Sequence, residues 1–372
     1  MTYAWSDTAG RLTSWFQRQT FPSAVRRIAA FPAALSSDVG LKRDENQDRV
    51  AIARGTTTVG RPYVLAVLSD GIGGMKDGAG CAAATLGNLF ACFFETGRPD
   101  QGLEPTLKLA VHAANSAIHS RLGGKGGATL SALLLCQGIA HIINVGDSRI
   151  YKYSASQLSQ LTVDDTIAGQ LGHKVEADMG SNLLQFIGIG EALEVNVVQV
   201  PFDKDDMLLL TSDGVHYLDK ALIATLVANS PDPGTALRRL TETAKWCGGH
   251  DNASAAIVLP HATLKELAEN RDAFCSIWDP FGELHLLPIR PRSAQPAAPA
   301  QLQDPVRQEV ATAATPSVAG PPSQPAKPTK SKRKRERKTK PPAQRGIEVA
   351  LESSHDQPKV PQLKIEFPQK GD

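Results

Sequence analysis

The sequence predicts a globular domain that combines buried β-strands with helices, followed by a proline-rich tail. Two observations lead to this prediction. Several short, continuous apolar runs end at glycine-rich breaks, which is typical of buried strands. Other segments, such as residues 79–91 and 103–118, carry small residues or apolar residues at helical spacing. A chain of 372 residues is long enough for one large domain with extensions, or for two domains.

The other motifs are arranged around residues 63–80. An apolar run over residues 64–68 is expected to be a buried strand, and it ends just before Asp70. The glycines that follow let the backbone turn away and come close to whatever this carboxylate holds. The sequence therefore presents a carboxylate at the end of a strand, inside a glycine-rich loop.

An aspartate at the end of an apolar run occurs at several further places. They are Asp48 before residues 50–53, Asp147 after residues 141–145, Asp213 after residues 207–210, and Asp251 before residues 253–259. Taken singly, each of these is more simply a turn. Taken together, the carboxylates would repel one another unless cations lay between them. Oxygen ligands favour hard ions, so the set predicts Mg²⁺ or Mn²⁺ rather than zinc or copper.

Six short motifs follow one another in order over a span of domain size. They read Arg-x-x-Asn-Gln-Asp, Asp-Gly-x-Gly-Gly, Gly-Ala-Thr, Gly-Asp-Ser-Arg, Ser-Asp-Gly and Asp-Asn. In this order they resemble the metal-dependent serine/threonine phosphatases of protein phosphatase type 2C, and the bacterial members look most similar. The resemblance covers residues 36–262 and implies an α+β fold: two packed antiparallel β-sheets flanked by helices on both faces. It places the metal site at one end of this sandwich.

The resemblance also implies roles for individual residues. Arg43 is expected to grip the substrate phosphoryl group, because the forked donors of a guanidinium match two phosphate oxygens. Asp70 is expected to bridge two metal ions whose shared water attacks phosphorus. The implied metal ligands are Asp48, Asp70, the Gly71 carbonyl, Asp147, Asp213 and Asp251. Asn46 and Asn252 are expected to orient them. The implied cofactors are two Mg²⁺ or Mn²⁺ ions, and a third ion is left open.

Three positions depart from the family pattern. Gln47 stands where many relatives carry glutamate, which removes one ligand that the second metal could use. Ile72 replaces a histidine that some eukaryotic relatives have, so the sequence does not identify a general acid. Asp165 replaces the histidine of a frequent Leu-Thr-x-Asp-His motif. It lies in residues 160–191, which correspond to the family's mobile flap and are expected to determine substrate preference.

Charge and cysteine content limit the classes to which the protein can belong. The net charge of +2 hides an acidic centre of −8 over residues 35–290, between basic ends of +3 and +7. Five widely spaced cysteines form no Cys-x-x-Cys pair, which argues against a disulfide framework and for a reducing compartment. No apolar run approaches the length of a membrane span. We therefore expect a cytoplasmic protein.

Composition also suggests domain boundaries. Residues 1–34 form a basic, amphipathic extension. This extension either touches a membrane surface or a partner, or is a leader that packs on the domain or stays loose, and the leader is favoured. The phosphatase domain is expected over residues 35–262. Residues 263–290 are expected to form a short extension that packs on it.

The C-terminal part of the chain differs sharply in composition. Residues 291–372 hold 14 of the 25 prolines and few aromatic residues, so they cannot bury a core and are expected to be disordered. Within them, a basic cluster over residues 327–340 carries nine basic residues and one acid. The cluster either contacts an acidic partner, nucleic acid or an anionic membrane, or is a solvated linker. The sequence favours neither interpretation.

Phosphorylated proteins are the expected substrates, and a cognate serine/threonine kinase is the expected opposing enzyme. The chain is expected to act as a monomer. The alternative is a non-catalytic regulator on the same fold, which binds phosphoproteins and uses the basic tail for tethering. Because every aspartate of the metal site is present, the sequence favours the enzyme.

Overall fold

The computed structural model describes residues 5–57, 60–96, 102–171, 182–269 and 275–286. The chain divides into two compact units, and all described residues belong to the first. The predicted disordered tail and its basic cluster lie outside the described residues, as does the middle of the predicted flap.

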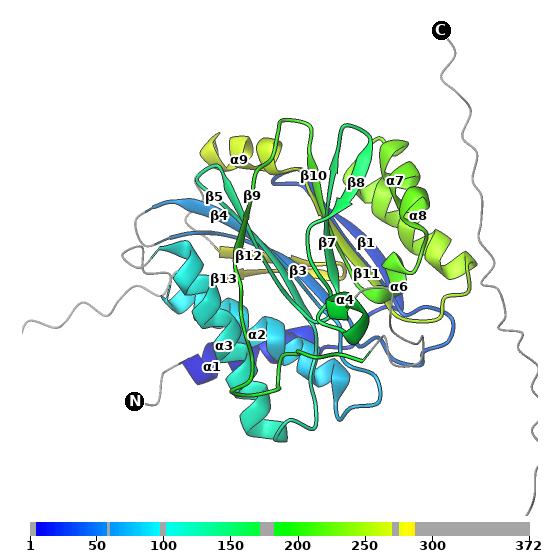
Figure 1. The fold of residues 1–372 in the computed structure, drawn as a ribbon. Coiled ribbons are helices and arrows are strands. Elements are labelled where there is room, and N and C mark those ends of the chain that lie inside the picture. The colour runs from blue at the N-terminus through cyan, green and yellow to red at the C-terminus, as the bar shows by residue number, and fades with distance from the viewer. Residues whose placement is uncertain (1–4, 58–59, 97–101, 172–181, 270–274, 287–372) are drawn as a thin grey trace, which may run out of the picture. The chain divides into compact units, whose positions relative to one another are not determined.

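Two antiparallel β-sheets form the centre of the fold (Figure 1). In the described part of the chain, the first sheet has six strands in the order β1 (Ser23–Ile28), β2 (Ala33–Asp38), β11 (Ala253–Val258), β10 (Met207–Thr211), β7 (Arg149–Ser154) and β8 (Gln157–Gln160). The second has seven, in the order β13 (Gly282–Leu286), β12 (Cys275–Asp279), β3 (Arg49–Thr56), β4 (Pro62–Ser69), β5 (Leu130–Cys136), β6 (Ile139–Val145) and β9 (Val198–Val200).

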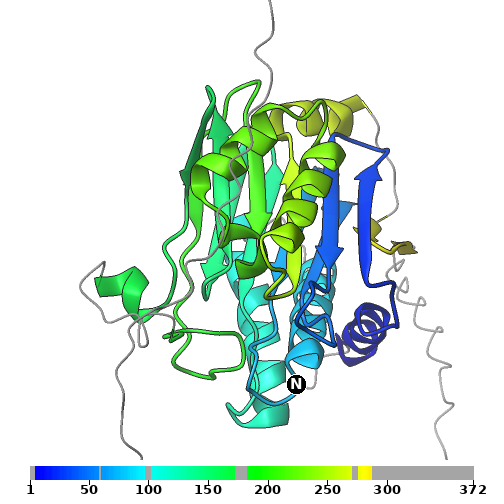
Figure 2. The ribbon, with the colours of Figure 1, turned by 90° about the vertical axis from the view of Figure 1, so that its right-hand side faces the viewer.

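Helices cover the outer face of each sheet (Figures 1 and 2). On the seven-stranded sheet lie α2 (Gly78–Thr96) and α3 (Leu103–Leu122), and α1 (Trp5–Phe16) packs on α2. The six-stranded sheet is covered by α6 (Asp213–His216), α7 (Lys220–Ala228) and α8 (Pro233–Trp246). Two further helices are α4 (Ile167–Leu171) in the predicted flap and α9 (Pro260–Glu269), which contributes Leu267 to the core between the sheets.

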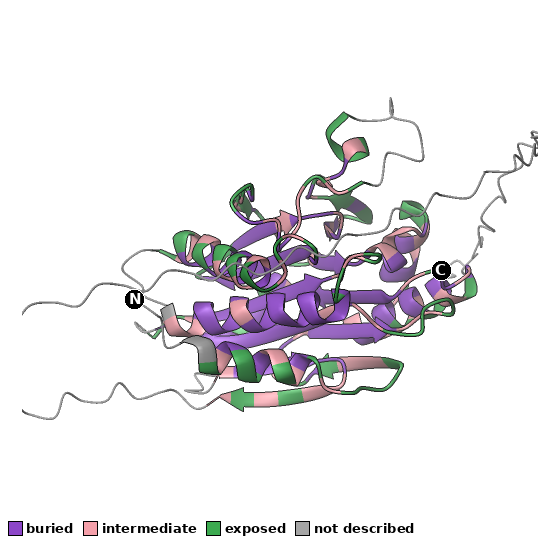
Figure 3. Ribbon diagram, turned by 90° about the horizontal axis from the view of Figure 1, so that it is seen from below, coloured by how far each residue is buried: buried purple, intermediate pink, exposed green. Residues whose placement is uncertain are grey.

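Three apolar clusters fill the three interfaces between these layers. Leu68 belongs to the cluster between the sheets, whereas Leu65 and Phe90 belong to the cluster between the seven-stranded sheet and its helices. Leu209 and Leu240 belong to the third, under α7 and α8. Leu65 and Leu68 face opposite sides because successive side chains of a strand alternate. Figure 3 shows the central strands almost entirely buried, while β13 alternates between partly buried and exposed residues. The predicted fold class is confirmed.

The N-terminal segment, which the sequence placed before the domain, takes part in the fold. Leu12 and Phe16 of α1 are buried, and the Phe16 ring stacks on Phe90 of α2 with centroids 6.0 Å apart. The apolar face of α1 is therefore used inside the molecule. β1 pairs with β2 along its whole length, and β2 begins at Ala33. The pairing of β1 with β2 thus crosses the expected start of the phosphatase domain at residue 35.

The segment expected to follow the domain contributes strands to the seven-stranded sheet. β12 pairs with β3, and β13 pairs with β12 at the edge. The Trp278 ring meets the Phe31 ring edge to face, with centroids 5.6 Å apart. Arg18, which follows α1, forms an ion pair of 2.7 Å with Asp279. The two ends of the described chain are therefore tied to each other.

Two further observations concern the described helices and the cysteines. None of the described helices is both long enough and apolar enough to cross a membrane. All five cysteines are free thiols, four of them buried.

Candidate metal centre

The aspartates of the seven-stranded sheet meet at one end of two adjacent strands. Arg49, at the start of β3, lies opposite Ser69, at the end of β4. Asp48 precedes the first of these residues and Asp70 follows the second, so the antiparallel register makes the two carboxylates neighbours.

The aspartates of the six-stranded sheet come to the same end. Thr211, the last residue of β10, pairs near the starts of β11 and β7. Asp213 follows β10, Asp251 precedes β11 and Asp147 precedes β7. The fold therefore brings together all five aspartates that the sequence singled out as metal ligands.

Asp70 lies at the centre of this acidic cluster. Its N–H donates to Thr129 Oγ1 at 2.9 Å, and its carbonyl accepts from the Thr129 N–H at 2.8 Å. Burial raises the pKa of Asp70 well above its ordinary value, and the charges of Asp48 and Asp213 raise it further. A carboxylate opposed in this way by its neighbours is stabilised by a cation.

Asp48 is the most buried member of the cluster, at 2 % exposure. Its Oδ2 accepts a hydrogen bond of 2.7 Å from Ser212 Oγ, while its Oδ1 is buried without a hydrogen-bond partner. Burial raises the pKa of Asp48 to about 7, the charge of Asp213 acts in the same direction, and the Ser212 hydroxyl opposes both. Because Ser212 follows β10, this hydrogen bond also joins the two sheets.

Asp213 begins α6 and resembles Asp48 in its surroundings. Its Oδ1 is buried and has no hydrogen-bond partner. Burial raises the pKa of Asp213 to about 6, and the charges of Asp251 and Asp147 raise it as well. A second carboxylate oxygen of the cluster is thus left unsatisfied.

Gly71 occupies a place with no room for a side chain. A Cβ at this position would overlap the backbone of Gly78, where α2 begins. The Gly71 N–H donates to the Gln47 carbonyl at 3.3 Å, and Gly71 forms an isolated bridge with Ala128. The glycine therefore lets the loop after β4 run close to α2, next to Asp70.

These residues suit a hard divalent cation. A buried polar oxygen without a partner is costly, and both Asp48 Oδ1 and Asp213 Oδ1 are in this position. Every candidate donor is an oxygen, which favours Mg²⁺ or Mn²⁺. In the described ranges, no three acidic, histidine or cysteine side chains already form a group that could hold a metal ion. The carboxylates would therefore have to close in around an ion, and the ligand set remains a prediction.

Two asparagines hold the loop that leads to Asp48. Asn252 Oδ1 accepts from the Gln47 N–H at 2.7 Å, and its amide group donates to two carbonyls of neighbouring loops. Asn46 Oδ1 accepts from the Asp48 N–H at 3.0 Å. Both side chains act on the loop backbone, as residues that orient a ligand would.

Arg43 lies at the open edge of the cluster, with 44 % of its side chain exposed. Its Nη2 is 2.6 Å from Asp251 Oδ2. The hydrogen bond with Asp251 raises the pKa of Arg43, and the charges of Asp213 and Asp70 act in the same direction. The guanidinium predicted to bind phosphate thus neutralises a predicted metal ligand.

Comparison with known proteins identifies the family of the chain. Over 241 residues the chain is 30% identical to the protein phosphatase PhpP of Streptococcus pneumoniae, a match that covers 60% of this chain and 96% of PhpP. The solved structure of the PPM Ser-Thr phosphatase MsPP from Mycobacterium smegmatis is 30% identical, with a TM-score of 0.52, and covers 63% of this chain and 99% of that chain. The chain belongs to the PPM family of serine/threonine protein phosphatases.

A third PPM relative is the serine/threonine protein phosphatase PstP of Mycobacterium tuberculosis. It is 30% identical over 240 residues, which cover 60% of this chain but only 44% of PstP. The solved catalytic domain of PstP, in complex with two manganese ions, is 27% identical with a TM-score of 0.51, and covers 63% of this chain and 97% of that chain. No family model matches the chain, so the PPM assignment rests on these relatives.

The start of the predicted flap is tied to the loop that carries Asp147. Arg149 forms an ion pair of 2.8 Å with Asp164 through partly buried side chains. Asp165 Oδ2 accepts from the Gly146 N–H at 3.1 Å. The residue that replaces the family's histidine therefore bonds to the backbone of the Asp147 loop.

Two residues of the PPM site were missed by sequence reasoning. Ser212 was noted only as part of a motif, although its place directly before Asp213 on a strand end was a usable signal. Arg49 donates to the Phe16 carbonyl at 2.6 Å and also to the carbonyls of Asn46 and Asp48. Its partner from α1 is distant in sequence, so no local pattern could have indicated this contact.

Proposed function

We propose that this chain hydrolyses phosphoserine and phosphothreonine in proteins, with Mg²⁺ or Mn²⁺ held at the acidic end of the sandwich. The observation that carries the proposal is the convergence of carboxylates from both sheets. Asp48 and Asp213 each retain a buried oxygen that no hydrogen bond satisfies. Two ions are proposed, in line with the two manganese ions of the PstP catalytic domain.

The proposed ligands are Asp70, Asp213, Asp251 and the Gly71 carbonyl, with Asp48 and Asp147 beside them. When bound, the metal lowers the pKa of a water molecule, which supplies the nucleophile, and offsets charge on the phosphoryl oxygens. The chain's own contribution is to bring these carboxylates together and to orient them. Ser212 does this for Asp48 through a hydrogen bond of 2.7 Å, and Asn252 holds the adjoining loop.

Arg43 is proposed to bind the phosphoryl group. Its exposed side chain lies beside Asp251, so it can turn from that carboxylate to an incoming phosphate. It would fix two phosphoryl oxygens and stabilise the charge that develops on them.

The test is release of phosphate from a phosphothreonine peptide by the purified full chain, with Mn²⁺, with Mg²⁺ and with a chelator. Release is expected only with metal, and it should be lost in Asp213→Asn, because the amide weakens metal binding. The matched control is Asp205→Asn, an exposed aspartate in a surface turn, which should behave like the wild type. Full activity of Asp213→Asn, or equal activity in chelator, would contradict the proposal.

The proposal extends to the opposing enzyme, a serine/threonine kinase that phosphorylates the same proteins. PhpP and PstP carry the names of protein phosphatases, which supports protein substrates here. Action as a monomer, a cytoplasmic location and contacts of the basic tail stay predictions from the sequence. A folded chain that binds phosphopeptide but never releases phosphate would favour the regulator that the sequence left as the alternative.

A further inference from the structure

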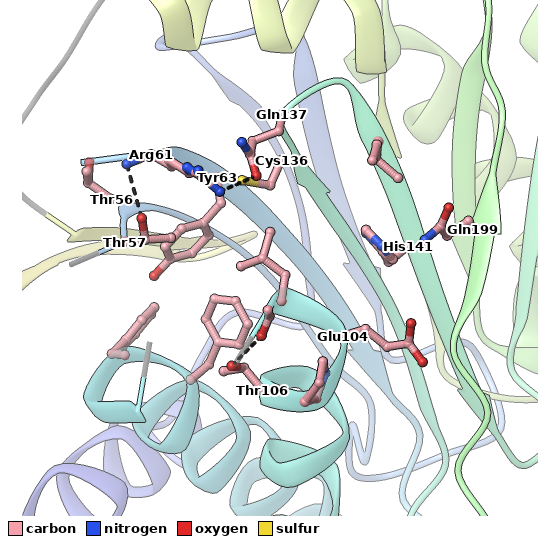
Figure 4. A pocket seen from close by; sticks show the side chains of 16 residues that line it. Thr56, Thr57, Arg61, Tyr63, Glu104, Thr106, Cys136, Gln137, His141 and Gln199 are labelled. Carbon is pink, nitrogen blue, oxygen red and sulfur yellow. Dashed lines mark hydrogen bonds between the residues drawn. The ribbon is translucent and has the colours of Figure 1, made fainter. Parts of the chain in front are cut away.

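A cavity of about 350 Å³ lies at the end of the seven-stranded sheet opposite to the acidic cluster. Figure 4 shows it between the start of β4, the turn from β5 to β6, and the adjoining ends of α2 and α3. Tyr63 lines the cavity and Asp70 directly follows the same strand, seven residues later, so about 23 Å separate the two places. A small molecule in the cavity could not touch the predicted metal site.

The floor of the cavity is aromatic. The rings of Tyr63 and Phe93 meet edge to face with centroids 4.9 Å apart, and both residues are almost fully buried. Phe94, which is partly buried, and Ile139, which is exposed, lie above this pair and form the apolar surface that a ligand can reach. Edge-to-face and offset stacking both favour a flat ring as a third partner.

Arg61 gives one side of the cavity a positive charge. Its Nη1 donates to Gln137 Oε1 at 2.9 Å, and among the described residues it has no acidic partner. Glu104 also lines the cavity, but it is paired with Lys108 at 3.0 Å. Figure 4 shows Arg61 and Glu104 on different sides of the space. The uncompensated charge is therefore that of Arg61, which favours an anion.

His141 supplies a polar group on the side away from Arg61. It is 6 % exposed, lines the cavity from β6, and its Nδ1 has no hydrogen-bond partner. Burial lowers the pKa of His141, so the ring is neutral near pH 7. A neutral imidazole both donates and accepts hydrogen bonds, which suits a hydroxyl group.

We propose that this cavity is a binding site for a small aromatic monocarboxylate. The ring would lie against Phe94 and Ile139, above the buried Tyr63 and Phe93, the carboxylate would pair with Arg61, and a polar group at the far end of the ring would meet His141. The volume fits this class, because it lies at the lower end of the range for small-molecule sites.

The test is a calorimetric titration of the full chain with 4-hydroxyphenylacetate and with its uncharged counterpart, 4-hydroxyphenylethanol. Saturable binding of the acid is expected, at least tenfold tighter than binding of the alcohol. Arg61→Gln should reduce the affinity for the acid to that of the alcohol. Arg11→Gln, which removes an exposed arginine of α1, should change neither affinity. A chelator is present throughout, so the result is independent of phosphatase activity.

A second variant, Ile139→Trp, tests whether the probes bind inside the cavity. Ile139→Trp adds bulk at a rim position that is 40 % exposed, so it should fold and block entry of both probes. The proposal is overturned if the acid shows no saturable binding to the wild type, or if the acid and the alcohol bind with equal affinity. It is also overturned if Arg61→Gln or Ile139→Trp binds the acid as tightly as the wild type does. Thermal melting of each variant confirms that it is folded.

Discussion

The two ends of β4 share one scaffold but differ in chemistry. Residues 64–68 between them are fully buried and alternate between two apolar clusters. At one end, Asp70 sits among carboxylates whose charges oppose one another. At the other, Tyr63 adjoins a cavity with an uncompensated arginine and an aromatic floor. The apolar run thus determines where the strand lies, while the residues just beyond each end determine what that end can bind.

After the loss of activity expected for Asp213→Asn, the largest effect is expected from Arg43→Gln at the acidic end. Hydrogen bonds to charged groups contribute about 1.5–3 kcal/mol, which corresponds to a loss of about 10- to 100-fold in kcat/KM on a phosphopeptide. Removing the ion pair with Asp251 should also make Mn²⁺ bind a few-fold more tightly, as measured by calorimetry. Lys42→Gln changes the neighbouring exposed cation and is the control. Unchanged kcat/KM in Arg43→Gln would remove this residue from the site.

Ser212→Ala should weaken Mn²⁺ binding by about tenfold, because residues that orient a metal ligand typically contribute about 10- to 100-fold. The serine donates to Asp48 Oδ2 at 2.7 Å, and its loss leaves that buried carboxylate with less support. Ser230→Ala removes a partly buried hydroxyl that donates to the Leu226 carbonyl and accepts from Arg239, with no contact to the acidic cluster, and should leave Mn²⁺ affinity unchanged. Equal affinities in the two variants would show that Ser212 has no positioning role.

Without added metal, the protein should lose stability as the pH rises. Burial raises the pKa of Asp48 to about 7 and that of Asp213 to about 6, from an ordinary 3.8. The folded state therefore binds more protons than the unfolded state, and the resulting stabilisation is complete below pH 3.8. It is lost as the pH rises from 3.8 through the folded pKa values of about 6 and about 7. Melting temperatures in chelator should fall over this window, and Mn²⁺ should restore them at neutral pH.

A flat melting profile in chelator would contradict this account of the acidic cluster. Asp48→Asn should flatten the profile, because the amide does not titrate. Asp205→Asn, at an exposed position, should leave the profile as it is in the wild type.

The smallest effect is expected at the other end of β4. Tyr63→Phe should change phosphatase activity by less than about twofold and stability by about 1 kcal/mol, because it removes a single buried hydroxyl. Phosphopeptide hydrolysis and urea unfolding check the two values. A large loss of activity would mean that the two ends of the strand are coupled.

Much of the fold and of the site could be predicted from the sequence. Local patterns were sufficient to place Asp70 and Asp213 at strand ends, because apolar runs and glycine breaks act over a few residues. The sandwich fold, with its metal site at one end, was predicted only because the order of the motifs resembles that of a known family. The packing of Phe16 on Phe90 could not be predicted, because nothing in either segment identifies its partner. The cavity beside Arg61 was also missed, since several strands and two helices that are far apart in the sequence line it.

The pairing of β1 with β2 has a consequence for shortened versions of the protein. β2 is buried along its whole length, and β1 is the strand that covers its outer side. A chain cut at residue 35, where composition alone would start the domain, would lose β1 and part of β2. The remaining strand would become an edge with unpaired backbone groups, which is a template for strand addition between molecules. Such a shortened protein should aggregate, even though it keeps every aspartate of the acidic cluster.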